Sequence, residues 1–162
     1  MPDIDFAFLA DAADAQPGQK FAVLGGGVSR VGGPNFPLRH PHLALVVGLL
    51  VTAPELNSEH ELRFVLLAPD GAELSSGAAR IRAAGAGDGR DTVISFAIDL
   101  WNLTFAEPGD YSFRILVGGS ERKRLPLVVE RRASATEADA SGDKPVDLGG
   151  QPPPFPPPTG QA

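Results

Sequence analysis

Apolar residues recur at every second position along most of this chain, which is the periodicity of a β-strand with one buried face. Polar, glycine-containing or proline-containing turns separate these runs. No segment has a convincing helical period, and only residues 101–107 are expected to form a helical turn. The pattern predicts about eight strands in an antiparallel β-sandwich or barrel. The alternating runs are residues 4–8, 62–66, 79–83, 94–100 and 111–117.

Some runs also predict how the strands are placed. Residues 43–51 are apolar on both faces and should form a central strand that is covered on each side. Residues 4–8 and 21–23 are expected to form one hairpin, and the runs on either side of residues 118–120 a second. Tyr111 in the second hairpin should lie inside the sandwich with Phe113, and its hydroxyl should bond to nearby backbone as in a tyrosine corner.

Composition and charge separate two parts of the chain and exclude some functions. The chain is 43% hydrophobic and 21% charged, which is typical of a folded domain. Residues 1–130 are predicted to form the β-sandwich domain, and residues 131–162, with 7 of the 16 prolines and no apolar period, a disordered Pro-rich tail. The net charge of −6 argues against binding to nucleic acids or anionic membranes.

The chain has no cysteine, which excludes disulfides and thiolate chemistry. The first residues carry two aspartates and no basic residue before Lys20, so no export signal is visible. The longest apolar run is far too short to cross a bilayer. We therefore expect a cytoplasmic protein.

Three short blocks carry a resemblance to a known family. They are residues 6–13 (FAFLADAA), residues 23–27 (VLGGG) with FP at 36–37 and HP at 40–41, and residues 107–113 (EPGDYSF). Together they resemble a bacterial family of small proteins known only as a domain of unknown function, over about residues 3–130. The third block is also frequent in immunoglobulin-like sandwiches, so the resemblance implies an immunoglobulin-like β-sandwich. It implies no activity and no catalytic residue.

Several patterns suggest ligand chemistry, and each has a plainer structural interpretation. The triple glycine at 25–27 lacks the further residues of a dinucleotide or phosphate loop, and a bulge or strand crossover explains it. His40 and His42 could face one zinc ion with His60 as a third ligand, although Pro41 suggests that the strand is only beginning there. The basic run at 121–124 is either a charged edge or a contact for an acidic partner. Calcium is suggested by Asp3, Asp5, Asp11 and Asp14, which also suit a solvated strand face and a turn.

The segment from Gly25 to His42 is the strongest candidate for a local function, because its many glycines and prolines imply an irregular path along a sheet. Phe36 is either an exposed aromatic anchor beside Arg39 or a plug for the open end of the sandwich. We predict a non-enzymatic binding or structural module without a cofactor. It would contact a protein partner through Phe36, Arg39 and His40. The alternative is a small-ligand or metal-binding protein, such as an enzyme subunit, that uses the same segment.

Overall fold

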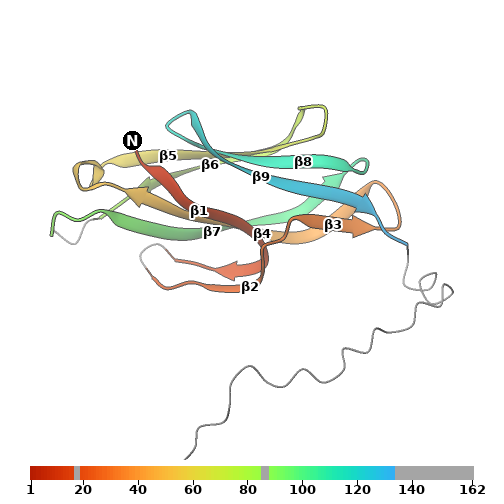
Figure 1. Ribbon diagram of the computed structural model, residues 1–162, viewed down its shortest axis with the longest axis horizontal. Coiled ribbons are helices and arrows are strands. Elements are labelled where there is room, and N and C mark those ends of the chain that lie inside the picture. Colours follow the sequence, from red (N-terminus) through yellow and green to blue (C-terminus); the bar gives the residue numbers. More distant parts are fainter. Residues whose placement is uncertain (17–18, 85–87, 134–162) are drawn as a thin grey trace, which may run out of the picture. The chain divides into compact units, whose positions relative to one another are not determined.

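The computed structural model describes residues 1–16, 19–84 and 88–133. Two β-sheets pack face to face (Figure 1). Sheet I has the order β2-β1-β4-β7, and sheet II the order β3-β9-β8-β5-β6. The strands of sheet I are β1 (Asp3–Asp14), β2 (Ala22–Gly26), β4 (Leu38–Val51) and β7 (Thr92–Phe105). Those of sheet II are β3 (Arg30–Gly33), β5 (Glu59–Leu67), β6 (Glu73–Arg82), β8 (Gly109–Val117) and β9 (Ser120–Arg131), and a 3₁₀ turn, η1 (Ala53–Glu55), precedes β5.

This architecture confirms the predicted all-β sandwich. The described strands exceed the predicted eight by one, because β3 is four residues long, contains two glycines and shows no clear alternation. The compact unit that contains both sheets spans Met1–Arg132. The predicted disorder of the tail concerns residues 134–162, which lie outside the described part of the chain.

The main core lies between the two sheets and confirms the predicted facing of β8. Tyr111 and Phe113 are both buried there, with Ile115 and Val117 following on the same face. The Tyr111 hydroxyl donates a hydrogen bond to the Glu107 carbonyl oxygen at 2.8 Å, so the predicted tyrosine corner is present. The hairpin of β8 and β9 is paired as expected from the glycine turn between them.

Strand β4 is central and covered on both faces, as predicted. Its odd-numbered residues from 43 to 51 belong to the main core, while Ala44 and Val46 are buried on the outer face of sheet I. The cover on the outer face comes from the hairpin of β1 residues 10–14 with β2, which we call the flap. β1 leaves β4 after the pair Ala10–Ala44 and continues with β2 alone. In Figure 1 the flap forms a further layer beneath sheet I, and the ring centroids of Phe21 and Phe6 are 5.7 Å apart.

One local expectation was wrong. Residues 101–105 form the end of β7 instead of a helical turn, because Leu103 and Phe105 alternate into the main core as strand residues do. Pro41, in contrast, is the fourth residue of β4, which begins at Leu38, so the strand is only beginning there as expected. The ladder passes from the pair His40–Leu103 to the pair His42–Trp101, and the residue opposite Pro41 is Asn102, with a φ of 53°. A proline without an N–H is tolerated where its partner strand is itself irregular.

The described residues contain no helix that is long and apolar enough to cross a membrane.

Candidate functional site

Trp101 is the large side chain that stands out on the surface of sheet I. It lies near the end of β7 on the outer face, and 65% of it is exposed. An exposed tryptophan leaves a large apolar area in water, so it usually has a contact to make. The ring does not stand alone, because its centroid lies 4.1 Å from that of His42, the residue paired with it across β4.

The His42 ring is fixed on both of its nitrogens. Nδ1 lies 2.8 Å from the Asp11 carbonyl oxygen, and Nε2 lies 2.7 Å from Oδ1 of Asp99. Both partners are acceptors, so both contacts are hydrogen bonds only when the ring carries a proton on each nitrogen. Three strands meet here, because Asp11 belongs to β1, His42 to β4 and Asp99 to β7. The arrangement fixes the surface against which Trp101 stacks.

The glycine run at 25–27 contributes to this site through its backbone. Gly25 has a φ of +61°, and a Cβ there would overlap the carboxylate of Asp11. Gly27 follows with a φ of +86°, and its N–H donates to the carbonyl oxygen of Leu9 as the chain leaves the flap. The glycines therefore let the chain cross from β2 towards β3 close over Asp11, in agreement with the crossover interpretation.

His40 lies on the same stretch of β4 and is half-buried. Burial lowers the pKa of His40 below 6.5, and a hydrogen bond with the backbone of His42 and the negative charge of Asp11 partly oppose that shift. Arg39 is exposed next to it and pairs with Thr104 of β7. Arg39 and His40, both singled out from the sequence, are thus within three residues of His42 on the same strand.

Phe36 lies in the loop between β3 and β4. It is half-buried, packs against the main core, and precedes a cis peptide bond to Pro37. The guanidinium carbon of Arg131 at the end of β9 lies 5.2 Å from the centre of its ring, within range of a cation–π contact. Along β4, His40 and Arg39 therefore lie two and three residues from His42, whose ring stacks on Trp101, whereas Phe36 lies near the end of β9.

We call the surface formed by Arg39, His40, His42, Asp99 and Trp101 the Trp101 surface. The sequence did carry a signal for its key residue: Trp101 shares the phase of Val93, Ser95, Ala97 and Asp99, opposite to that of Ile94 and Phe96. A large aromatic residue in the polar phase of a strand is a candidate surface contact. Because residues 101–107 were expected to form a helical turn, Trp101 was not assigned to the polar phase of the strand.

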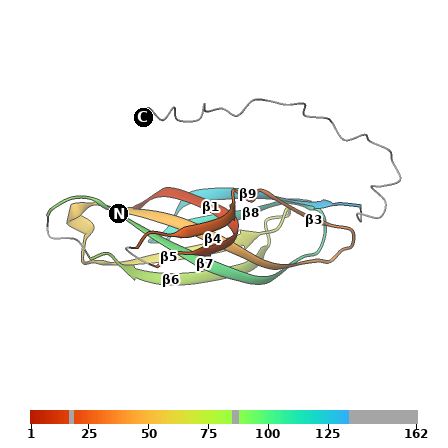
Figure 2. The ribbon, with the colours of Figure 1, turned by 90° about the horizontal axis from the view of Figure 1, so that it is seen from below.

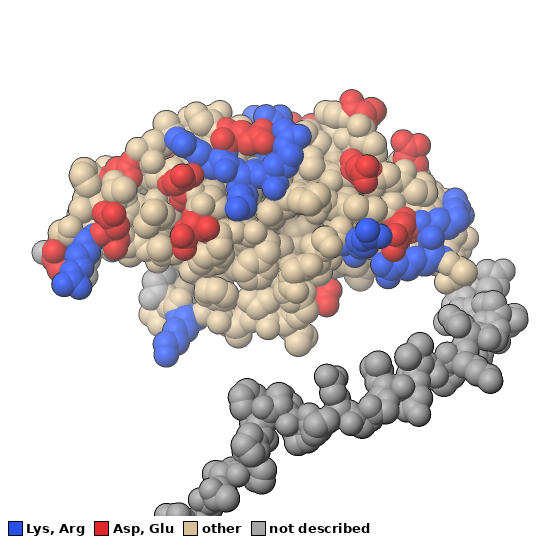
Figure 3. Space-filling model, viewed as in Figure 1, with Lys and Arg blue, Asp and Glu red and all other residues tan. Residues whose placement is uncertain are grey.

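Acidic and basic side chains lie close together at several places on the described residues. Among the described residues no three His, Asp or Glu side chains converge to hold a metal ion. In the basic run, Glu121 accepts hydrogen bonds from Arg124 and Arg114, which hold the pKa of its carboxyl below the usual range. Figure 3 shows the same interleaving on the face that it presents, where carboxylates lie within each basic cluster.

The fold and this surface define a two-layer β-sandwich with a hairpin flap and an exposed tryptophan that stacks on His42. Its strand pairs are antiparallel, as predicted, except that β3 pairs parallel with β9. By its sequence the chain belongs to a family of unknown function (DUF6941), whose model matches residues 5–130. A search of curated proteins gives no significant match.

Two solved structures are distantly similar. One is an alkylpurine DNA glycosylase, AlkC, of Pseudomonas fluorescens bound to DNA with an abasic site analogue, with 13% identity and a TM-score of 0.44. The match covers 80% of this chain but only 30% of the glycosylase chain. The other is a CARDB domain from Pyrococcus furiosus in complex with di-metal ions, with 12% identity, a TM-score of 0.35, and coverage of 79% and 92%. At these scores neither likeness bears on function.

Proposed function

We propose that the protein is a non-enzymatic binding module that recognises another protein through the Trp101 surface. The observation that carries this proposal is the exposed indole of Trp101, held over a His42 ring that Asp99 and the Asp11 backbone fix in place. Tryptophan is enriched among the few residues that dominate protein interfaces. A ring that is already ordered loses little conformational entropy on binding, so its contact area contributes fully to affinity.

The same geometry supports a binding role over a catalytic one. His42 would be the natural acid or base of this surface, but each of its two nitrogens lies within 2.8 Å of an oxygen atom of the protein itself. A general base needs a free nitrogen within hydrogen-bond reach of its substrate. The space over the glycine run is likewise filled by the Asp11 carboxylate against Gly25, which favours a structural role for that segment over a small-ligand site.

The interleaved charges on the face that Figure 3 presents support a protein partner instead of a polyanion such as a nucleic acid or an anionic membrane. A cytoplasmic location is part of the proposal, and fractionation of host cells tests it.

The test is capture of a partner by the immobilised full-length protein from a lysate of its own host, quantified by mass spectrometry. Trp101→Ala should reduce the captured amount at least about thirtyfold, the effect of losing an interface residue worth about 2 kcal/mol. The melting temperature should stay within a few degrees, because the ring is mostly exposed.

Leu24→Ala on β2 is the matched control, because Leu24 is also exposed and apolar but lies on the flap. It should leave capture unchanged. Equal capture by the wild type and Trp101→Ala would refute the proposal, and so would an equal loss in the Leu24 variant. Phe36→Ala in the same assay tests the contact residue expected from the sequence.

A further inference from the structure

β7 is a long sheet edge that lacks the usual protection against pairing with another strand. In the described part of the chain it pairs with β4 alone, and Figure 2 shows it running along one side of the sandwich near β6. The other edge strands are protected: β2 and β3 have only 5 and 4 residues, and β6 carries Glu73, Arg80 and Arg82. β7 has 14 residues, no proline, and Asp99 as its one charged residue. Edges of this kind recruit another strand.

We infer that β7 pairs antiparallel with β7 of a second copy of this chain, in the register that places Ala97 opposite itself. The inference rests on the proposed function, since it takes the Trp101 surface as a protein contact and names its partner. The product would be one continuous sheet made from sheet I of each copy, related by a two-fold axis through the Ala97 pair.

The side chains on the outer face of β7 are complementary in this register. Positions 93 and 101 are equally far from Ala97, so Val93, which is 40% exposed, would face Trp101 of the second copy. Aromatic and β-branched residues are favourable cross-strand pairs. Ser95 would face Asp99 of the second copy, which puts a hydroxyl donor opposite the only carboxylate of the strand. No like charges meet along the pairing, although the whole chain carries −6.

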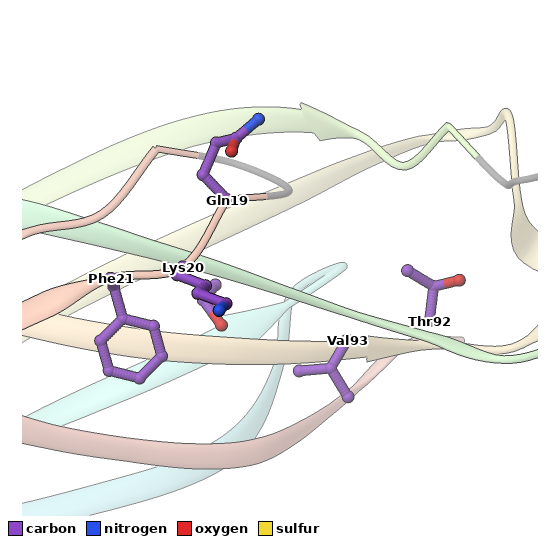
Figure 4. A pocket seen from close by; sticks show the side chains of 6 residues that line it. Gln19, Lys20, Phe21, Thr92 and Val93 are labelled. Carbon is purple, nitrogen blue, oxygen red and sulfur yellow. The ribbon is translucent and has the colours of Figure 1, made fainter.

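A hollow lies where the second tryptophan would go. Beside Val93, on the outer face, the segment that precedes β2 and the start of β7 enclose an open pocket of about 600 Å³. Figure 4 shows Phe21 and Lys20 from the flap side and Thr92 and Val93 from β7 around it. Phe21 is itself 38% exposed. It offers an aromatic surface to an indole, and the ammonium of Lys20 offers a cation–π contact.

The spacing along the strand makes this contact possible only in a second copy. Trp101 lies eight positions after Val93, about 27 Å along an extended strand, so a protein cannot place its own Trp101 in its own hollow. Antiparallel pairing reverses one strand and brings each tryptophan to the hollow of the other copy. The nine residues from 93 to 101 would also form about eight to ten main-chain hydrogen bonds across the new edge.

The first experiment measures the mass of the full-length protein by sedimentation equilibrium over about a hundredfold range of concentration. The wild type should form a dimer. Trp101→Ala should raise the dissociation constant at least about thirtyfold, and Ala97→Lys, which places two ammonium groups opposite each other, should give a monomer. Leu24→Ala is again the matched control, since this exposed leucine lies on β2 of the flap, and it should not change the dimer.

The second experiment tests the register and uses the absence of cysteine from the chain. Opposed residues of an antiparallel pair have Cα atoms about 4.5–5.5 Å apart, within the range of a disulfide. Ala97→Cys should therefore cross-link to itself rapidly under mild oxidation. Ser95→Cys should not cross-link to itself, because residue 95 of the second copy would lie four positions away along the partner strand.

The outcomes separate this inference from the proposed function. A protein that is monomeric throughout, or a dimer that both Ala97→Lys and Trp101→Ala leave intact, would overturn the inference. Cross-linking that is no faster for Ala97→Cys than for Ser95→Cys would overturn its register. If the protein is monomeric while Trp101→Ala still abolishes capture of a host protein, the proposed function stands and only the identity of the partner is wrong.

Discussion

Tyr111 shows how far a single residue could be predicted from local sequence. The block EPGDYSF places a turn directly before an alternating run, so the phase of the strand follows from the position of the turn. The structure buries Tyr111 edge-on against Phe105, with ring centroids 5.0 Å apart, and its hydroxyl reaches back only four residues to Glu107. Both the facing and the hydrogen bond depend on neighbours in the sequence, which is why both were predictable.

We expect Tyr111→Phe to lower the free energy of unfolding by about 1 kcal/mol, the net contribution of one buried hydrogen bond. Phe113→Ala should lower it by about 3–5 kcal/mol, because the cavity lies in the main core. Urea unfolding followed by fluorescence and circular dichroism measures both. A neutral Phe113→Ala would contradict the facing of β8 described above.

His40 gives the stability a pH dependence. Burial holds the pKa of His40 below 6.5 in the folded protein, so the unfolded chain takes up a proton at this residue first as the pH falls. The contribution of the neutral His40 ring to the free energy of unfolding is fully present above about pH 6.5 and declines as the pH falls below that value. His40→Gln should flatten this part of the profile of unfolding free energy against pH.

The matched control is His60→Gln, a change in β5 of the other sheet that should keep the decline. The prediction fails if His40→Gln and the wild type lose stability in parallel between neutral and mildly acid pH.

At the scale of elements, each sheet contains an aromatic ring laid over a glycine of the neighbouring strand. Phe6 of β1 is paired with Gly48 of β4, and Phe64 of β5 with Gly77 of β6. In both pairs a Cβ on the glycine would overlap the ring. The glycine therefore provides the space that lets the ring lie flat on the sheet, and in sheet I this ring supports the flap through Phe21.

We expect Gly48→Val to lower the free energy of unfolding by about 1–3 kcal/mol, although valine is the better strand residue, because the new side chain displaces the ring of Phe6. Chemical denaturation measures the loss. In a Phe6→Ala background the same substitution should cost less, since no ring is left to displace, and a double-mutant cycle gives that coupling. Equal costs in both backgrounds would show that overlap with Phe6 is not the cause.

The elements that were predicted correctly are those defined by local alternation and turns. Residues 43–51 could be placed at the centre of a sheet because both of their phases are apolar. β3 could not be found, since the pairing of Arg30–Gly33 with β9 is a long-range contact that leaves no period in four residues. The end of β7 was missed for a similar reason: Leu103 and Phe105 identify a strand only once the core that they enter is known.

At the scale of the whole molecule, the candidate site depends on arrangements that no local pattern contains. The sequence indicates that Phe21 and Val23 are strand residues, but not that their hairpin folds over the outer face of sheet I. The sequence contains Trp101 but does not reveal that its strand, β7, lies at the edge of a sheet. It also contains His42 and Asp99 but does not reveal that Nε2 of the histidine lies 2.7 Å from Oδ1 of the aspartate. For this reason the sequence drew attention to Phe36 in an unusual segment, whereas the structure draws it to Trp101 in an ordinary strand.

The parallel pairing of β3 with β9 has a consequence for biosynthesis. A ribosome makes the chain from its N-terminus, and β3 ends at Gly33 while its partner in sheet II ends at Arg131. Val31, buried in the finished protein, therefore has no strand to join until almost the whole sandwich has been synthesised. Pairings between such distant segments form slowly and leave apolar surface open in the meantime. The nascent chain should accordingly depend on chaperones until β9 emerges, and the sandwich closes only then.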